Sequence, residues 1–442
     1  MLCYNTKDYI RGSVILTDNI YSLGEKAVGR FICSDRFNTT FISFHFYLPL
    51  CSDTMTEDAL LPYLLTSCCE EYKTFTELNT RLLQLYGAEL SCSVSKSGDY
   101  LHTKIGLSVI NNGFAYDNEN VLEEGVKLLT SLIFSPSVSD GAFYTADLQR
   151  EKRKTVERIE SEINNKRSFA RTRLTEMLFE NEPYGRFLYG TCEEVEAITE
   201  KSAYKAWERL LQKAYIHINV VGKELPNGLF DIVKNEIGKM DRSTISDVAA
   251  SLPLLPKDEP SLKTEYMDVT QGKRVMGFSS EVYGTLQEAL PLMLFSDIFG
   301  GGPYSRLFSN VREKLSLCYY CSSQQRRSKG FLMVDSGVEA DKAEEAEQAI
   351  LNELQAIQNG TVEENRLSSS KKSVIDSLAS YYDSPNALDM WYTRDIGTND
   401  SLTPDDAISM IEGITAEDIV KTAQGIKLHS VYKLMPSKEV EA

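Results

Sequence analysis

The strongest constraint on the fold is that the second half of this 442-residue sequence repeats the order of motifs in the first half. The first half contains EDALLPYLL, LNTRLLQLYGAELSCSVS and SGDYLHTKIGLSV. The second half contains QEALPLMLF, YSRLFSNVREKLSLCYYCSS and KGFLMVDSGV, at an offset of about 230 residues. A fourth block, EEVEAITEKSAYKAWERLLQKAYIHINVVG, recurs as DAISMIEGITAEDIVKTAQGIKLHSVYKLMP after about 216 residues. The sequence therefore predicts two tandem copies of one module, with loops of different length.

Each copy contains strand-like and helical patterns without a regular alternation between them. Runs such as RFNTTFISFHFYLPL and VMGFSSEV are typical of strands. Thr74 followed by Glu77 predicts a capping box at a helix start, and Gly87 predicts the stop. A long amphipathic helix is predicted over roughly 140–180. Segregated strands and helices favour the α+β class, with an antiparallel-rich sheet packed on helices in each module.

The stretch 241–262 separates the two copies. Its sequence, DRSTISDVAASLPLLPKDEPSL, is rich in Pro, Ser and Asp, which is typical of an interdomain linker. We therefore predict a first module over 1–240, a linker over 241–262 and a second module over 263–442.

Composition excludes several classes of function. Apolar residues make up 42% of the chain and charged residues 25%, as in an ordinary soluble protein. No run approaches the roughly 20 apolar residues that a membrane span needs, and the N-terminus lacks the pattern of a secretory signal. We expect a cytoplasmic protein without a membrane partner. A net charge of −17 argues against nucleic acid as a partner, because phosphate binding needs a basic surface.

The cysteines indicate reduced, structural thiols. They are odd in number and scattered along the chain: Cys3, Cys33, Cys51, Cys68, Cys69, Cys92, Cys192, Cys318 and Cys321. Cys318 and Cys321 form a C-x-x-C, but the surrounding LCYYCSS is strand-like. Strand alternation predicts that their sulfurs point to opposite faces, which suits neither a chelate nor a redox pair.

The four histidines predict no metal site. His45, His102, His217 and His429 are far apart in sequence, and each lies in a strand-like run. An isolated strand histidine is more often packed or solvated than a metal ligand. A catalytic zinc normally takes three protein ligands, and the sequence shows no such set.

Residues 56–90, TEDALLPYLLTSCCEEYKTFTELNTRLLQLYGAEL, resemble the first helical segment of the insulinase/pitrilysin-like zinc peptidases, also called inverzincins. Active members carry H-x-x-E-H there, in which two His bind zinc and the Glu activates water. The matching positions here are Ala59, Pro62 and Tyr63. The resemblance therefore implies the fold of a zinc peptidase without its metal ligands.

The family's third ligand is a Glu on a later helix, in a pattern of two acids separated by six residues. The corresponding stretch here is REKRKTVERIES, residues 150–161. Glu151 matches the first acid and Arg158 the second, and a shift of one residue would place Glu157 there instead. One carboxylate without the two His does not hold zinc tightly, so we expect these charges to form a solvated helix face.

The second half retains more of the family pattern, in GGGPYSRLF and in NVREKLSLCYY. In active members, an Arg and a Tyr at this spacing help to hold the substrate backbone. The matching residues are Arg312 and Tyr319, whose donors suit a peptide carbonyl. The resemblance implies that Arg312, Tyr319 and the loop Gly300, Gly301 and Gly302 bind peptide. The alternative interpretation is that these residues are remnants of the family fold and have no function.

The whole chain is similar to the non-catalytic member of a bacterial pair of insulinase-like proteins. Such pairs are organised like mitochondrial processing peptidase, in which one subunit brings H-x-x-E-H and the other a glycine-rich loop. The resemblance implies a half-clamshell that completes a peptide-binding chamber with a catalytic homologue, or with a second copy of itself, and zinc only in a catalytic partner. The alternative is a structural or assembly protein of the same fold with no role in proteolysis. A third reading, an active hydrolase with an unrecognised metal site, would need the scattered histidines to converge in space.

Overall fold

The computed structural model describes residues 8–11, 14–242, 245, 251–394 and 402–437, and the chain divides into two compact units. Unit 1 takes residues 1–159, 188–249 and 381–399, and unit 2 takes 160–187, 250–380 and 400–442. Part of the predicted linker, 243–244 and 246–250, lies outside the described residues. Within the described ranges, no helix is long and apolar enough to cross a membrane.

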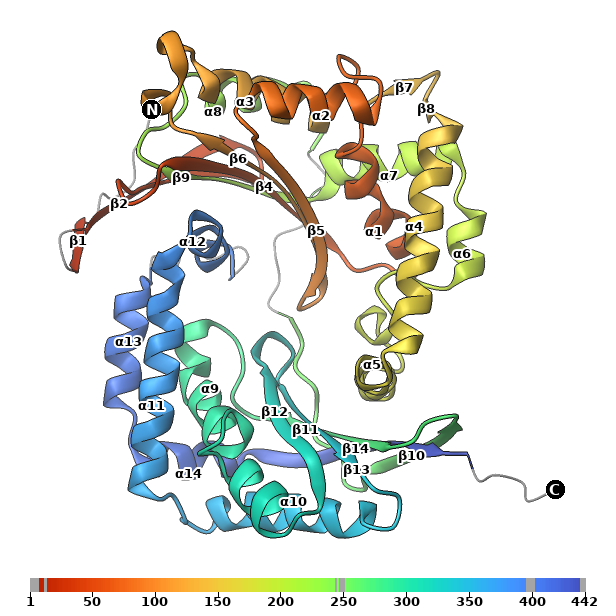
Figure 1. Ribbon diagram of the computed structural model, residues 1–442, viewed down its shortest axis with the longest axis vertical. Helices are drawn as coiled ribbons and strands as arrows, with labels where there is room; N and C mark the ends of the chain where they lie inside the picture. Colours follow the sequence, from red (N-terminus) through yellow and green to blue (C-terminus); the bar gives the residue numbers. More distant parts are fainter. Residues whose placement is uncertain (1–7, 12–13, 243–244, 246–250, 395–401, 438–442) are drawn as a thin grey trace. The chain divides into compact units, whose positions relative to one another are not determined.

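Unit 1 is built on a seven-stranded sheet with the order β1-β2-β3-β9-β4-β6-β5 (Figure 1). Its strands are β1 (Asp8–Arg11), β2 (Val14–Gly24), β3 (Ala27–Cys33), β4 (Thr39–Pro49), β5 (Glu89–Ser97), β6 (Tyr100–Ile110) and β9 (Tyr215–Gly222). Only β3 and β9 pair in parallel. Helices cover both faces, so central strand β4 is buried along almost its whole length, including its polar residues Ser43 and His45.

Unit 2 is built on a five-stranded sheet with the order β10-β14-β11-β13-β12. Its strands are β10 (Ser261–Met267), β11 (Gly272–Ser280), β12 (Cys318–Arg326), β13 (Phe331–Val338) and β14 (Ile426–Pro436). The same order occurs in unit 1 as β3-β9-β4-β6-β5, when the strands of each half are numbered along the chain. In both sets of five strands the first pair, β10–β14 or β3–β9, is parallel and the other pairs are antiparallel. A duplicated module accounts for one topology occurring twice.

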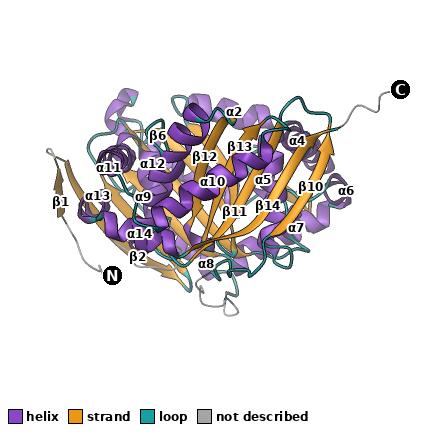
Figure 2. Cartoon of the chain, turned by 90° about the horizontal axis from the view of Figure 1, so that it is seen from below, coloured by secondary structure: helices purple, strands orange, loops and turns teal. Residues whose placement is uncertain are grey.

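The helices pack on these sheets, which confirms the predicted α+β class (Figure 2). Unit 1 contains α1 (Met55–Leu65), α2 (Phe75–Gln84), α3 (Val121–Phe134), most of α4 (Thr145–Asn164), α6 (Cys192–Ala197), α7 (Glu200–Lys213), α8 (Leu229–Gly238), α12 (Pro385–Tyr392) and the short pair β7 (Val138–Ser139) and β8 (Ala142–Phe143). Unit 2 contains α5 (Lys166–Leu178), α9 (Leu286–Gly300), the π-helix η4 (Leu307–Lys314), α10 (Ala343–Gln358), α11 (Glu364–Ala379), α13 (Pro404–Gly413) and α14 (Ala416–Gln424).

Local sequence signals place some helix ends correctly and miss one. The predicted capping box between Thr74 and Glu77 starts α2, and Gly87 follows its end with a φ of +74°. The single helix predicted over 140–180 is wrong, because α4 and α5 are separate helices. The two helices are separated at Asn165, whose side chain accepts a hydrogen bond from the Ser168 N–H and so caps the start of α5.

Each unit includes one helix from the other half of the sequence. Helix α5 belongs to unit 2, where it packs on β11 and β14. Gly277 allows this close approach, because a Cβ there would lie 2.8 Å from Leu178 Cδ2. Arg167 on α5 also pairs with Asp335 on β13, with Nε 2.5 Å and Nη2 3.1 Å from its carboxylate oxygens. Helix α12 belongs in turn to unit 1.

Strand β12 departs from regular alternation at its start. Its pairing with β13 shifts between Cys318 and Tyr320, so that Tyr319 is an extra, bulged residue. Cys318 pairs with Val338 and Cys321 with Ser336, as read from the register. The two partners are two residues apart on β13, so both cysteines lie on the same face. The predicted placement of their sulfurs on opposite faces is therefore wrong.

Candidate functional site

The three positions that match H-x-x-E-H lie on α1 and carry side chains unsuited to zinc. Ala59 is fully buried in an apolar cluster with Met55. Pro62 is inside the helix and buried. The Tyr63 hydroxyl lies 3.0 Å from that of Tyr189, and burial, followed by this hydrogen bond, raises the pKa of Tyr63. In place of the two His and the Glu of active members, these three positions therefore carry a methyl group, a proline ring and a neutral phenol.

Helix α4 supplies a cation beside these residues. The Arg158 guanidinium carbon lies 3.7 Å from the centroid of the Tyr63 ring, a cation–π contact. Glu151 is almost fully buried, contrary to the expected solvated face, and pairs with Lys154 at 2.8 Å. Glu157, the alternative match, is exposed. A fixed guanidinium disfavours a second cation nearby, so these residues do not fit a zinc ion.

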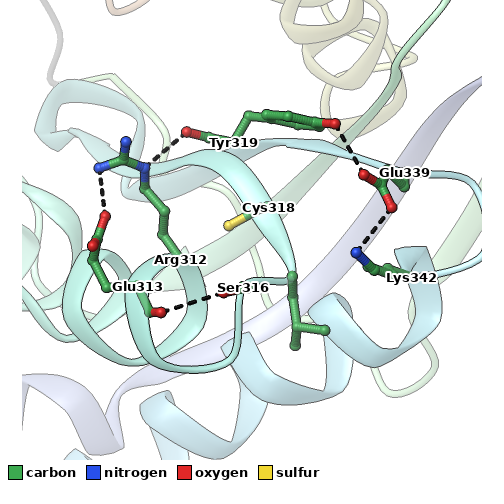
Figure 3. Close-up of a pocket in the computed structure, with 8 residues that line it drawn as sticks. Arg312, Glu313, Ser316, Cys318, Tyr319, Glu339 and Lys342 are labelled. Carbon is green, nitrogen blue, oxygen red and sulfur yellow. Dashed lines mark hydrogen bonds and ion pairs between the residues drawn. The ribbon is translucent and has the colours of Figure 1, made fainter.

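Arg312 and Tyr319, the residues predicted to bind peptide, lie together in unit 2 (Figure 3). They line a pocket of about 320 Å³ with Glu313, Ser316, Leu317, Cys318, Glu339 and Lys342. Arg312 lies on η4, and its Nε donates a hydrogen bond to the Tyr319 carbonyl at 2.9 Å. The Tyr319 hydroxyl donates to Glu339 at 2.9 Å. Both side chains are therefore held in place at the pocket, and both stay partly open to solvent.

The π-helix explains how the pocket is formed. The Leu315 N–H donates to the Asn310 carbonyl, five residues earlier, at 3.0 Å. Ser316 then takes a φ of +52°, a strained conformation for a residue with a side chain, and turns the chain into β12. This turn, together with the bulge at Tyr319, presents Tyr319 to the pocket.

The glycine loop that the resemblance assigned to peptide binding is explained by packing. Helix α9 ends at Gly300, where a Cβ would lie 2.6 Å from the backbone N of Ser323. A Cβ on Gly301 would lie 2.4 Å from Asp297 Oδ2, and one on Gly302 would lie 2.9 Å from the Tyr304 ring. None of the three glycines belongs to the lining of the Arg312 pocket. Their role in binding stays a prediction.

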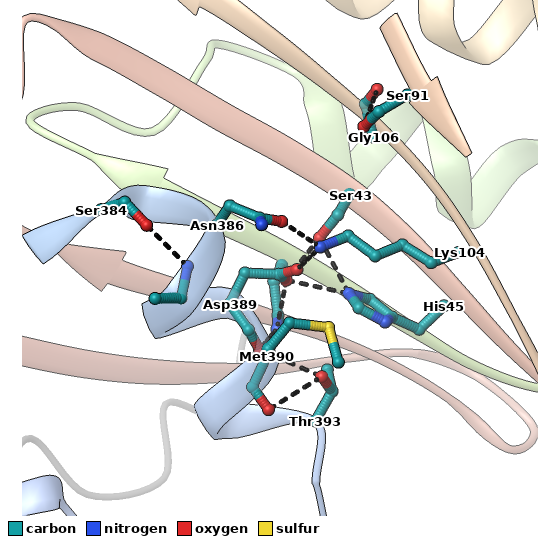
Figure 4. Close-up of polar contacts among 12 residues, drawn as sticks. Ser43, His45, Ser91, Lys104, Gly106, Ser384, Asn386, Asp389, Met390 and Thr393 are labelled. Atoms are coloured by element: carbon teal, nitrogen blue, oxygen red, sulfur yellow. Dashed lines mark hydrogen bonds and ion pairs between the residues drawn. The ribbon is translucent and has the colours of Figure 1, made fainter. Parts of the chain in front are cut away.

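Three of the histidines, predicted to be isolated, meet inside unit 1 (Figure 4 shows part of the cluster). His45 Nδ1 lies 2.9 Å from His102 Nε2 on the neighbouring strand, and His45 pairs with His217 across β4 and β9. His45 Nε2 lies 2.8 Å from Asp389 Oδ1 on α12, and Lys104 Nζ lies 2.5 Å from Asp389 Oδ2. The sequence does not reveal this cluster, because its members come from three strands and a distant helix.

The cluster has the electrostatics of a buried ion-pair network. Burial opposes ionisation of Asp389, but the charges of His45 and Lys104 outweigh it and lower the pKa of this carboxyl. Burial lowers the pKa of His217 to about 3, and Arg30 acts in the same direction. Burial also lowers the pKa of His102. In the described part of the chain, no group of three or more His, Cys, Asp or Glu is arranged to hold a metal ion. We therefore assign this cluster to the anchoring of α12.

Comparisons with known proteins agree with this geometry. Residues 197–374 match the family model described as "Peptidase M16 inactive domain". The chain is 29% identical over 403 residues to the "Probable inactive metalloprotease YmfF" of Bacillus subtilis (strain 168), covering 91% of this chain and 94% of that protein. It also resembles the crystal structure of a conserved protein from Enterococcus faecalis V583, at a TM-score of 0.88 and 25% identity, covering 96% of this chain and 100% of that chain.

A second solved structure shares the fold. It is a "peptidase M16 inactive domain" from Pseudomonas fluorescens, with a TM-score of 0.76 and 17% identity, covering 95% of this chain and 98% of that one. The similarity spans both halves of the sequence, and the α1 positions hold Ala59, Pro62 and Tyr63 where active members hold zinc ligands. In sequence and in fold, the chain is therefore similar to M16 peptidase homologues whose names describe them as inactive.

Proposed function

We propose that the chain is a non-catalytic subunit that pairs with a catalytic M16 homologue and completes a peptide-binding chamber with it. The observation that carries this proposal is an asymmetry between the two halves. The α1 site has lost its ligands and is filled by Tyr63 and Arg158, whereas Arg312 and Tyr319 lie together in an open pocket. Zinc would then be bound only by the partner.

The pocket has the donors and the backbone edge that an extended peptide needs. The Arg312 guanidinium and the Tyr319 hydroxyl are both donors to a carbonyl oxygen. Strand β12 is the last strand of its sheet, so among the described residues its outer N–H and C=O groups have no neighbouring strand. A peptide that adds to such an edge gains main-chain hydrogen bonds with little demand on its sequence. These features support the binding of peptides in extended form.

Single substitutions in the pocket test the proposal in the complex with the catalytic homologue. Arg312→Gln and Tyr319→Phe each remove a donor and should lower the peptidase rate of the complex by roughly 10- to 100-fold, somewhat below the loss of an oxyanion-hole donor. Complex formation, followed by size-exclusion chromatography, should not change. Arg153→Gln is the matched control, because Arg153 is an exposed arginine of α4. Unchanged rates in both pocket variants would refute the assignment.

A structural or assembly role is the second candidate, and one observation favours it. Both pocket side chains already have acidic partners, since Arg312 pairs with Glu313 at 3.0 Å and Tyr319 donates to Glu339. Purification of the tagged chain from its own cells, followed by mass spectrometry, separates the candidates. A near-stoichiometric M16 partner with an intact H-x-x-E-H supports the proposed subunit. A complex without such a partner supports the assembly role.

A further inference from the structure

Two thiols meet at the wall of the Arg312 pocket. The bulge at Tyr319 places Cys318 and Cys321 on one face of β12, and the two thiols hydrogen-bond each other. Cys318 lines the pocket, and Figure 3 shows its sulfur directed toward the side that holds Arg312. Both cysteines are buried, with 9% of Cys318 and 5% of Cys321 exposed, and Cys321 does not line the pocket. Only the Cys318 thiol is thus placed at the wall of the pocket.

The backbone geometry permits a bond between them. Their partners on β13 are two residues apart, which corresponds to a Cα–Cα separation of about 6.6 Å at 3.3 Å per residue. Disulfides span about 4.4–6.8 Å between Cα atoms, so this pair lies near the upper limit. A disulfide formed here would be somewhat strained, and strained disulfides are the more easily reduced ones.

The surroundings give the two thiols different reactivities. The hydrogen bond from Cys321 lowers the pKa of Cys318, and Arg312 acts in the same direction while burial opposes both. The same hydrogen bond, together with burial, raises the pKa of Cys321. The thiolate is the nucleophile in thiol chemistry, so the thiol at the pocket reacts first and the buried thiol second.

We propose that Cys318 and Cys321 are a redox-active pair that forms a reversible disulfide within β12 by exchange with a low-molecular-weight disulfide. The Cys318 thiolate attacks one sulfur of the small disulfide, forms a mixed disulfide and releases one small thiolate. The Cys321 thiol then loses its proton and attacks the Cys318 sulfur, which releases the second small thiol. The two cysteines are oxidised by two electrons, and one small disulfide is reduced to two thiols.

Oxidation would act on the residues that surround the bulge. Tyr319 lies between the two cysteines, and its carbonyl accepts the Arg312 hydrogen bond. A covalent bond across the bulge fixes this segment and removes the thiolate from beside Arg312. Any effect on peptide binding rests on the proposed function, whereas the disulfide chemistry does not depend on it.

The test uses the full-length protein with oxidised glutathione, without partner or peptide. Trypsin releases residues 315–326, LSLCYYCSSQQR, which hold these two cysteines and no others. After incubation with oxidised glutathione and alkylation of free thiols, this peptide should be unalkylated and two hydrogen atoms lighter than the dithiol form. Treatment with dithiothreitol should restore alkylation at both positions.

Two controls make the result decisive. In Cys321→Ser, Cys318 should retain a glutathione adduct, because no second thiol resolves it. Cys68 is the internal control, since burial raises its pKa to about 11, and Cys318 should alkylate at least about 10-fold faster. Two alkylated cysteines after oxidation, or a stable glutathione adduct in the unmodified protein, would overturn the proposal. If Cys321→Ser does not fold, as judged by circular dichroism, the mass of the unmodified protein decides alone.

Discussion

Replacing Asp389 by Asn should strongly destabilise unit 1, because this carboxylate is the centre of the buried cluster. Asp389 is fully buried, and besides His45 and Lys104 it accepts hydrogen bonds from Ser43 at 2.6 Å and from Asn219 at 3.0 Å. Asn has nearly the same shape but no charge. The substitution therefore leaves the Lys104 ammonium buried without its counter-charge.

The magnitude follows from what remains around Lys104. Removing one partner of a buried ion pair costs about 3–5 kcal/mol. Lys104 Nζ also donates to Asn386 at 2.5 Å and lies 4.7 Å from the centroid of the Phe41 ring, and both contacts survive the substitution. We therefore expect a loss of about 3 kcal/mol. Adding Lys104→Met removes the orphaned charge as well, so the double variant should recover about 2 kcal/mol of that loss.

Tryptophan fluorescence measures this loss in the relevant unit. The only two tryptophans, Trp207 and Trp391, both belong to unit 1, and Trp391 is two residues from Asp389. In urea at pH 7, with an m-value of about 3 kcal/mol/M, a loss of about 3 kcal/mol lowers the unfolding midpoint by about 1 M. Circular dichroism before the titration checks that the variants are folded.

Two results would refute this reasoning. A midpoint for Asp389→Asn within about 0.2 M of the unmodified protein would mean that the ion pair contributes little. A double variant no more stable than Asp389→Asn would mean that the orphaned Lys104 charge is not the cause of the loss.

Two further predictions concern pH and packing. Burial holds the pKa of His217 at about 3, against about 6.5 in an unfolded chain, so the unfolded state binds the extra proton first and stability falls as the pH falls. Between pH 7 and pH 5 this one group should cost about 2 kcal/mol, measured by urea titration at both pH values, and His217→Gln should lose this part of the dependence. Gly300→Ala should destabilise unit 2 by about 1–3 kcal/mol, because the new Cβ would meet the backbone N of Ser323 at 2.6 Å. Gly413→Ala is its control, since nothing lies within 4 Å of a Cβ there; equal melting temperatures for the two variants would contradict the packing explanation.

Predictions from the sequence succeeded where the signal is local. The run around His45 was correctly expected to be a strand, and Thr74 was correctly expected to cap a helix. The prediction of one helix across Asn165 was wrong, because the Asn165 side chain caps a new helix although the amphipathic pattern continues. The C-x-x-C was correctly placed on a strand, but its two thiols were assigned to the wrong faces. One bulged residue, which the sequence does not signal, reverses the alternation that follows it.

The sequence by itself determined the repeated topology, the resemblance to the M16 peptidases and the absence of the zinc ligands at Ala59, Pro62 and Tyr63, because these depend on residue identity and order. Only the tertiary structure showed that His45, His102 and Asp389 lie together. It also showed that α5 belongs to unit 2 and α12 to unit 1, and that Cys318 and Cys321 share one face of β12. Such contacts depend on strand register and on packing between distant segments. A shift of one residue in register changes which side chains face each other, and a local sequence pattern does not specify that register.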